Sequence, residues 1–381
     1  MARLRVALGP GLGGDGKLKD VAPQAVLWGN GSGFSFHRHG QAPVAVADPW
    51  EGLAVGSASH VGLAVGFFAY ELAPFLDPAL AVRGGGAGLP LAYWAFLPPP
   101  PWPQASHAGP FTARGPLSCS LDAERFRRGV EAIRAAIGAG EVYQVNLTRR
   151  WEAGFSGDPA GLWAALVGPR PPRFAFFLED RELGLAVLGL SPELFLVKRG
   201  NVLQSWPIKG TWDAAEAPEE PGEKEHAELA MIVDLVRHDL GRLCLLGSVK
   251  VACPSRPVRT RDVVHREAVV EGSLPPGVSF EDILTATFPG GSVTGAPKIA
   301  AASLIAALEP VPRSVYCGAY GVLLPGGDFT LAMPIRTGYV VGGRLFFHAG
   351  AGIVWDSEAG AEERETRAKV ASWFQVLGEG T

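Results

Sequence analysis

The last third of the sequence limits the fold most strongly, because three apolar runs follow one another with only short turns between them. These runs cover 316–324, 331–339 and 344–349. Turns this short join antiparallel neighbours, whereas parallel strands need a longer crossover. The runs 174–178 and 183–190 likewise predict a hairpin, which ends at Ser191-Pro192-Glu193. We therefore expect a mostly antiparallel sheet.

Apolar residues at helical spacing predict helices between the strands. The first covers about 122–137, with Ser120 as its N-cap and Gly138 and Gly140 at its end. The next covers about 223–246, and the last covers about 358–377. A glycine-rich loop over 288–298 opens a further helix that runs to Leu308. Strands and helices occur in mixed clusters, which favours an α+β fold over a Rossmann fold.

A proline-rich stretch suggests where the chain divides. Residues 97–103 include five prolines, which fit neither a central strand nor a helix interior. We interpret 97–116 as an exposed connection. The prediction is an N-terminal lobe over 1–116 and a catalytic region over 117–381.

Composition excludes several classes of protein. The net charge of -4 gives no electrostatic case for nucleic-acid binding. The four cysteines, Cys119, Cys244, Cys253 and Cys317, form no C-x-x-C pair, so neither a disulfide framework nor a zinc site is expected. The sequence has no signal-like N-terminal segment and no uncharged apolar run of 18 residues. We therefore expect a cytoplasmic protein.

Lys209 is the first candidate for chemistry. It follows Trp206, Pro207 and Ile208 directly, an unusually apolar approach for a lysine. An amine placed there would be partly desolvated, which lowers its pKa and frees the nucleophilic neutral form. The alternative is a lysine that extends from a strand end to solvent.

Two carboxylate pairs form the second candidate. Glu225 and Glu228 lie three residues apart on one predicted helix, and Glu362 and Glu365 lie three apart on another. Converging carboxylates would suit Mg²⁺, although solvated helix faces would give the same spacing. The strand over 141–149 shows Gln144 and Asn146 on one face, which is either solvated or the wall of a site.

The order of these motifs resembles the chorismate-binding enzyme family, and within it the aminodeoxychorismate synthases. The matching stretches are 140–146, 191–193, 207–211, 227–235, 288–298, 335–337 and 350–365. The likeness covers about 120–375, and the N-terminal lobe appears short beside the family's. The resemblance implies large, mostly antiparallel sheets packed face to face, with helices outside.

The resemblance also implies roles for individual residues. Lys209 matches the lysine nucleophile of the enzymes that aminate C4 of chorismate, where anthranilate synthases carry alanine. Gln144 stands where the isochorismate-forming members carry a lysine that activates water. Glu193 would be the general acid on the C4 hydroxyl. The remaining implied residues are Glu228, Glu362 and Glu365 for Mg²⁺, and Arg336, Gly350, Gly352, Thr294, His265, Gln144 and Thr211 for substrate.

The implied reaction is amination of chorismate to 4-amino-4-deoxychorismate, on the route to 4-aminobenzoate and folate. No glutaminase-like cysteine setting is visible, so the implied partner is a separate glutamine amidotransferase subunit that supplies ammonia. The nearest alternative is anthranilate synthase component I, which aminates C2 and eliminates pyruvate. A non-catalytic chorismate-binding subunit is a third interpretation. His238 and Arg266 depart from the family's usual residues beside these motifs.

Overall fold

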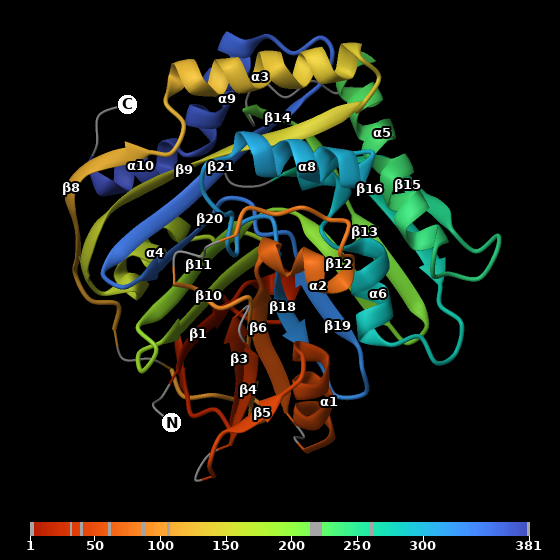
Figure 1. Cartoon of the computed structure of the whole chain (residues 1–381). Coiled ribbons are helices and arrows are strands. Elements are labelled where there is room, and N and C mark those ends of the chain that lie inside the picture. Colours follow the sequence, from red (N-terminus) through yellow and green to blue (C-terminus); the bar gives the residue numbers. More distant parts are fainter. Residues whose placement is uncertain are drawn as a thin grey trace.

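The computed structural model describes residues 4–30, 33–38, 41–59, 62–84, 88–104, 107–213, 223–259 and 263–378. Within these residues the strands form two large sheets, and helices lie outside them (Figure 1). The strand pairs are antiparallel. The expected α+β fold with mostly antiparallel sheets is confirmed.

Each sheet combines strands from distant parts of the chain. The first sheet has the order β17 (Gly295–Ala296), β9 (Gln144–Gly157), β21 (Arg344–Ile353), β20 (Thr337–Val341), β11 (Leu185–Ser191), β10 (Phe174–Asp180), β1 (Leu4–Leu8) and β2 (Lys19–Val21), with β8 (Phe111–Cys119) beside β9. The second has the order β14 (Ile208–Asp213), β16 (Val263–Ser273), β13 (Val202–Trp206), β12 (Leu194–Arg199), β19 (Phe329–Ala332), β18 (Ala319–Leu323), β6 (Leu63–Phe68), β7 (Ala92–Leu97), β3 (Ala25–Asn30), β4 (Gly33–Arg38) and β5 (Val44–Val46), with β15 (Lys250–Arg259) beside β16.

The two sheets pack face to face through a shared apolar core. Val6 and Phe176 from the first sheet join Val65 and Tyr320 from the second in this core. The rings of Phe176 and Tyr320 stack across the interface with centroids 4.5 Å apart. Alternation of side chains along each strand leaves the opposite faces free for helices.

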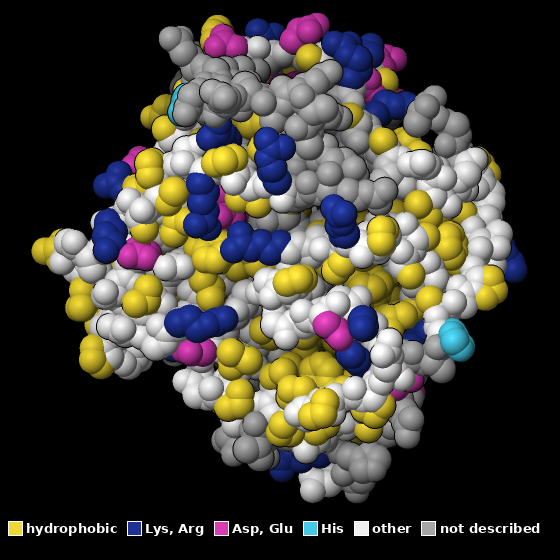
Figure 2. All heavy atoms as spheres, turned by 180° about the vertical axis from the view of Figure 1, so that it is seen from behind, with side chains coloured by type: hydrophobic (Ala, Val, Ile, Leu, Met, Phe, Trp, Pro, Cys, Tyr) yellow, Lys and Arg dark blue, Asp and Glu magenta, His cyan; other side chains and the backbone are white. Residues whose placement is uncertain are grey.

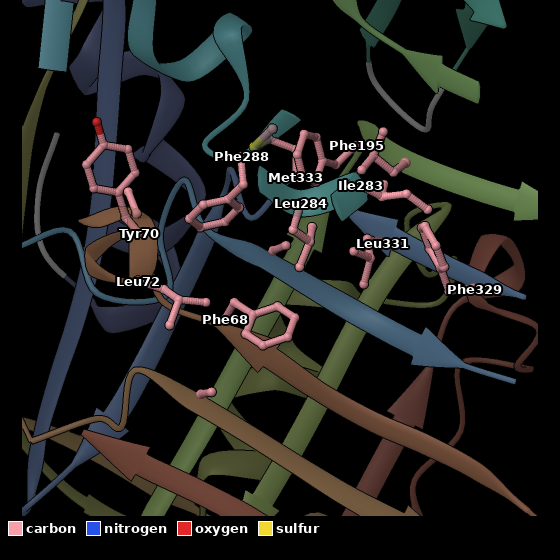
Figure 3. Packing of buried hydrophobic residues seen from close by; sticks show 14 of the residues in the cluster. Phe68, Tyr70, Leu72, Phe195, Ile283, Leu284, Phe288, Phe329, Leu331 and Met333 are labelled. Atoms are coloured by element: carbon pink, nitrogen blue, oxygen red, sulfur yellow. The ribbon is translucent and has the colours of Figure 1, made fainter. Parts of the chain in front are cut away.

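Helices cover the outer faces of the sheets. On the first sheet, α4 (Pro159–Val167) and α10 (Ala371–Leu377) contribute to one apolar cluster. A second cluster, beside the ends of β9 and β21, involves α3 (Ala123–Gly138), α8 (Lys298–Leu308) and α9 (Ala359–Lys369). On the second sheet, α1 (Pro49–Ser59), α5 (Glu223–Gly241) and α6 (Phe280–Thr287) pack on strands that include β6 and β19. Figure 3 shows part of the apolar cluster between these helices and the second sheet, with Phe68 and Leu331 on one side and Ile283 and Leu284 on the other.

The expected N-terminal lobe contributes strands to both sheets. Strands β1 and β2 belong to the first sheet, whereas β3 to β7 belong to the second. The connection expected over 97–116 is wrong in part, because Phe111–Cys119 forms β8 and pairs with β9. The division at 116 stays a prediction, and that position lies inside β8.

Several expected boundaries need correction. The helix after residue 120 is capped by Asp122, whose side chain accepts from the backbone N–H of Arg125, and Ser120 instead accepts from Arg150 N. The helix expected over 223–246 ends at Gly241, and the final helix is divided at Val370. The glycine loop does not feed directly into a long helix, since α7 (Gly291–Thr294) and β17 precede α8. The sequence also predicts a mobile acidic stretch over 213–223, and this stretch lies largely outside the described residues.

The most informative correction concerns the single strand expected over 331–339. The chain leaves β19 at Ala332 and enters β20, in the other sheet, at Thr337. Pro334 lies between them and cannot donate to a ladder, and Arg336 has a φ of 50°. Arg336 therefore lies in the link between the two sheets and belongs to neither strand.

Candidate active site

A cavity with a volume of about 570 Å³ lies where the two sheets and helices α5, α7 and α9 meet. Ten residues singled out from the sequence line it: Asn146, Glu193, Lys209, Glu228, His265, Arg336, Gly350, Gly352, Glu362 and Glu365. The sequence distance between these residues is large, so the fold is what brings them together. A cavity of this size is typical of a site for a small molecule.

Lys209 reaches the cavity from β14, which pairs with β16 across an irregular register between Lys209 and Thr211. The Nζ atom of Lys209 lies 3.5 Å from the position that a Cβ atom would take at Gly352. Desolvation lowers the pKa of Lys209, and nearby carboxylates, Glu228 first among them, oppose that shift. The amine is therefore easier to deprotonate than a lysine in water, as a nucleophile requires.

Glu193 lies in the two-residue link between β11 and β12 and is only 5% exposed. Its backbone N–H donates to Ser191 Oγ at 3.1 Å, and Ser191 Oγ donates to Met333 O at 2.6 Å. Its Oε1 atom accepts from Ser292 Oγ at 2.9 Å. Burial raises the pKa of Glu193 to about 7, although the Ser292 hydrogen bond and the charge of Lys209 act in the opposite direction. A carboxyl group held in this way can donate a proton near neutral pH.

The loop that carries Ser292 packs directly on the core below the site. A Cβ atom at Gly290 would lie 2.3 Å from Met333 Cε, so a larger residue there would have to displace the end of the Met333 side chain. Figure 3 shows Met333 beside Phe195 and near Phe288.

Arg336 and His265 border another part of the cavity. Burial lowers the pKa of Arg336, which still leaves its guanidinium a cation able to bind a carboxylate. Burial, with the charge of Arg336 as a smaller cause, lowers the pKa of His265 to about 4. His265 Nδ1 lies 3.3 Å from Gly210 O. At neutral pH the imidazole is uncharged, and it can offer a hydrogen bond without adding charge to the site.

Three carboxylates line the cavity from two helices. Glu228 comes from α5, and Glu362 and Glu365 come from α9. Glu362 accepts from Ser357 Oγ at 2.7 Å, and Glu365 forms an ion pair with Lys369 at 2.5 Å. Across the described part of the chain, no three His, Cys, Asp or Glu side chains are gathered as a ready metal site. The donors are those that Mg²⁺ prefers, and they share one cavity, so the set fits Mg²⁺ in chemistry.

Two further residues predicted for the substrate, Gln144 and Thr294, are not among the described residues that line the cavity. Gln144 is 1% exposed and lies behind Gly352, with its Nε2 atom 2.8 Å from the Cβ position there. Thr294 is fully buried next to Val293, which does line the cavity. The side chain of Thr211 is outside the described residues, as is that of Glu225.

Sequence reasoning missed several residues of the cavity wall, among them Ser292, Tyr316, His348 and Lys369. Two of them carried a visible signal. His348 lies at period two from Gly350 and Gly352 on β21, so it shares their face. Lys369 lies four residues after Glu365 on α9 and shares its helix face. Its Nζ atom donates to Gly350 O at 2.9 Å.

The surface away from the view of Figure 1 has no single dominant charge. Lys and Arg side chains gather in its upper and left parts, and hydrophobic side chains are scattered among them (Figure 2). Within the described ranges, none of the helices has the length and apolar character needed to span a bilayer.

Comparisons with known proteins agree with the motifs. The family described as chorismate binding enzyme matches residues 101–375. The chain is 36% identical over 269 residues to aminodeoxychorismate synthase component 1 of Escherichia coli, which covers 68% of this chain and 59% of that protein. It is 35% identical over 268 residues to anthranilate synthase component 1 of Saccharolobus solfataricus, covering 68% of this chain and 63% of that protein. The matched part is less than two thirds of either relative's length.

A solved structure extends the likeness to nearly the whole fold. Anthranilate synthase component I from Streptococcus pneumoniae superposes with a TM-score of 0.77 at 25% identity, covering 97% of this chain and 92% of that one. The face-to-face antiparallel sheets are therefore the architecture of these enzymes. The chain belongs to the chorismate-binding enzyme family.

Proposed function

We propose that this protein aminates chorismate at C4 to give 4-amino-4-deoxychorismate. The observation that carries the proposal is the partly desolvated amine of Lys209, which shares one cavity with a buried carboxyl group at Glu193. A reaction in which an amine displaces a hydroxyl group needs such a nucleophile and such an acid together. The similarity to aminodeoxychorismate synthases supports this choice.

In the proposed mechanism Lys209 attacks C2 of the ring as a neutral amine. Both conjugated double bonds of the ring shift, the C4–O bond breaks with its electron pair on oxygen, and Glu193 gives the proton with which the hydroxyl leaves as water. Ammonia then attacks C4, both double bonds shift back, and the lysine nitrogen leaves C2 as a neutral amine. Lys209 is regenerated, and the product carries its nitrogen at C4.

The positive and polar groups around the cavity orient the substrate. We propose that Arg336 and the backbone N–H groups near Gly350 and Gly352 bind one carboxylate. Mg²⁺ held by Glu228, Glu362 and Glu365 would supply positive charge for the other carboxylate. Lys369, whose Nζ atom lies beside Glu365, adds a second cation at that end of the cavity.

Ammonia would come from a separate glutamine amidotransferase subunit. Names such as "component 1" among the relatives support a multi-subunit enzyme. We expect free ammonia to sustain turnover by the isolated chain, and glutamine to act only with the partner. Formation of product from glutamine by the chain alone would contradict this arrangement.

Anthranilate synthase component I is the second candidate, because the structural likeness to that enzyme spans almost the entire chain. The deciding experiment incubates the purified protein with chorismate, ammonia and Mg²⁺ and identifies the product by mass and absorbance. We expect 4-amino-4-deoxychorismate without release of pyruvate. Anthranilate together with an equal amount of pyruvate would favour the second candidate.

A further inference from the structure

A second, much smaller cavity lies behind Glu193. Its volume is about 20 Å³. Glu193 and Ser292 line both this cavity and the 570 Å³ cavity, so these two side chains form the wall between them. A space of roughly 10–15 Å³ is enough to hold one water molecule. The small cavity therefore has room for one water molecule beside Glu193.

The far side of the small cavity reaches toward solvent through an ion pair. Asp239, on α5, lines the cavity and is 8% exposed. Its two carboxylate oxygens accept from Lys298 Nζ at 3.2 Å and 3.0 Å. The Lys298 side chain is 19% exposed. The cavity is thus bounded by a buried acid at one end and by a partly solvated charged pair at the other.

The walls between these two ends are mostly apolar. Phe195, Leu196, Val236, Leu240 and Met333 provide them, and Ser205 adds one buried hydroxyl. A buried water needs two to four polar partners, and Glu193, Asp239 and Ser205 are available for it. Apolar walls would keep such a water at one position between the two carboxyl groups.

We propose that this cavity holds one water molecule that returns a proton to Glu193 after each turnover, with Asp239 as the residue that positions the water and admits the proton. This inference rests on the proposed function, in which Glu193 loses a proton to the departing hydroxyl group. The substrate occupies the other face of Glu193 at that moment. A path from behind allows the acid to be protonated again without crossing the substrate cavity.

The proton count closes over one cycle. Glu193 gives one proton to the leaving hydroxyl, which departs as water, and becomes a carboxylate. Ammonium in solution releases one proton to solvent when it enters the reaction as ammonia. The nitrogen added at C4 keeps its three protons, so the product leaves with an ammonium group. One proton from solvent, passed through the water beside Asp239, restores Glu193.

The charges around both ends suit this transfer. Burial raises the pKa of Glu193 to about 7, the charge of Lys209 lowers it, and the charge of Glu267 on β16 raises it. Burial also raises the pKa of Asp239, and the charges of Lys298, His238 and Arg242 oppose that shift. The pKa values of both carboxyl groups are therefore closer to neutral pH than the pKa of a carboxyl group in water, which favours exchange of a proton between them.

The test fills the cavity with one methylene group. Val236 lines the cavity, whereas Val233, one turn earlier on α5, packs against the same core without lining it. Val236→Ile and the control Val233→Ile are compared by following chorismate consumption with ammonia and Mg²⁺. We expect Val236→Ile to keep the first turnover at the wild-type rate, because Glu193 starts protonated. Later turnovers should slow about tenfold, with a larger solvent deuterium isotope effect and an unchanged KM for chorismate.

A crystal structure of the wild-type protein at high resolution provides the second arm, and it does not depend on how the variant folds. We expect an ordered water in contact with Glu193 and Asp239. An empty cavity, or a Val236→Ile enzyme that matches Val233→Ile in every turnover and in its isotope effect, would overturn the inference. Anthranilate as product would overturn the proposed function and leave this comparison valid, since consumption of chorismate is what is followed.

Discussion

The Nζ atom of Lys209 and a Cβ atom added at Gly352 would lie 3.5 Å apart, and the same Cβ atom would lie 2.8 Å from Gln144 Nε2. Gly352→Ala should therefore displace the Gln144 amide, whereas Lys209 Nζ would meet the added atom at ordinary van der Waals distance. We expect its KM for chorismate to rise about 5- to 100-fold, since overpacking costs roughly 1–3 kcal/mol. The control is Gly241→Ala, because an added Cβ atom there meets nothing within 4 Å. Equal KM values for the two variants would refute this account of the strand.

Replacement of Lys209 separates a nucleophile from a simple counter-charge. Arginine keeps the charge but has no free amine, so Lys209→Arg and Lys209→Ala should both lose about a hundredfold or more of C4 amination. Direct attack of ammonia at C2 in Lys209→Ala could yield a C2-aminated product. Wild-type protein with chorismate and no ammonia should carry a covalent adduct, located on Lys209 by peptide mapping. The exposed Lys250→Arg is the control, and normal turnover by Lys209→Arg would show that the amine is not the nucleophile.

The dependence of rate on pH should have two limbs. The acid limb reports deprotonation of Lys209, whose pKa is lowered by burial, because only the neutral amine attacks. The alkaline limb reports Glu193, whose protonated form is lost as the pH rises through about 7. We expect kcat/KM for chorismate to fall about tenfold for each pH unit above that value. A rate that continues to rise beyond pH 9 would exclude Glu193 as the acid.

Removal of metal tests the three carboxylates. EDTA should abolish turnover, and added Mg²⁺ should restore it. Glu228→Gln and Glu365→Gln should each weaken Mg²⁺ binding, measured by calorimetry without substrate, by about tenfold or more. The exposed Glu281→Gln should bind as the wild type does. Unchanged Mg²⁺ affinity in either test variant would remove that residue from the metal set.

A buried carboxylate from the N-terminal part of the chain should make stability depend on pH. Glu71 accepts from the backbone N–H groups of Arg313 at 2.7 Å and Ser314 at 2.9 Å, and burial raises its pKa from 4.5 to about 7. A carboxyl whose pKa is higher in the folded state stabilises most below pH 4.5, and this contribution is lost as the pH rises to about 7. Between these pH values the free energy of unfolding of the wild type should fall, and that of Glu71→Gln should fall by on the order of 1–3 kcal/mol less.

Urea unfolding at pH 5 and pH 8 measures this difference. The exposed Glu358→Gln should follow the wild type at both values. If the stability of Glu71→Gln changes with pH as that of the wild type does, then titration of Glu71 does not contribute to the free energy of unfolding.

The parts predicted correctly from sequence depend on local periodicity. The hairpin over 174–190 was readable because apolar runs and a short turn lie side by side in the chain. Glu362 and Glu365 share the cavity, as spacing by three on a helix suggested. The desolvation of Lys209 could be predicted from the three residues that precede it, which are apolar. Each of these signals lies within a few residues.

The parts that failed depend on contacts between distant segments. The run 331–339 has the composition of one strand, yet its halves pair with strands of different sheets. Ser120 and Asp122 are both good caps, and the contact of Ser120 with Arg150 decides between them. The small cavity behind Glu193 is bounded by segments as far apart as Phe195 and Met333. Such a space is a property of packing and has no signature in the sequence.

The interleaving of early and late strands has a consequence for synthesis. Val65 of β6 pairs with Val322 of β18, so one edge of β6 has no partner until most of the chain has been made. Contacts this distant in sequence make folding slow and leave unpaired strand edges exposed in the meantime. The nascent N-terminal third therefore has a β-edge that must be kept from other chains, and the ribosome-bound protein is where a chaperone would be needed.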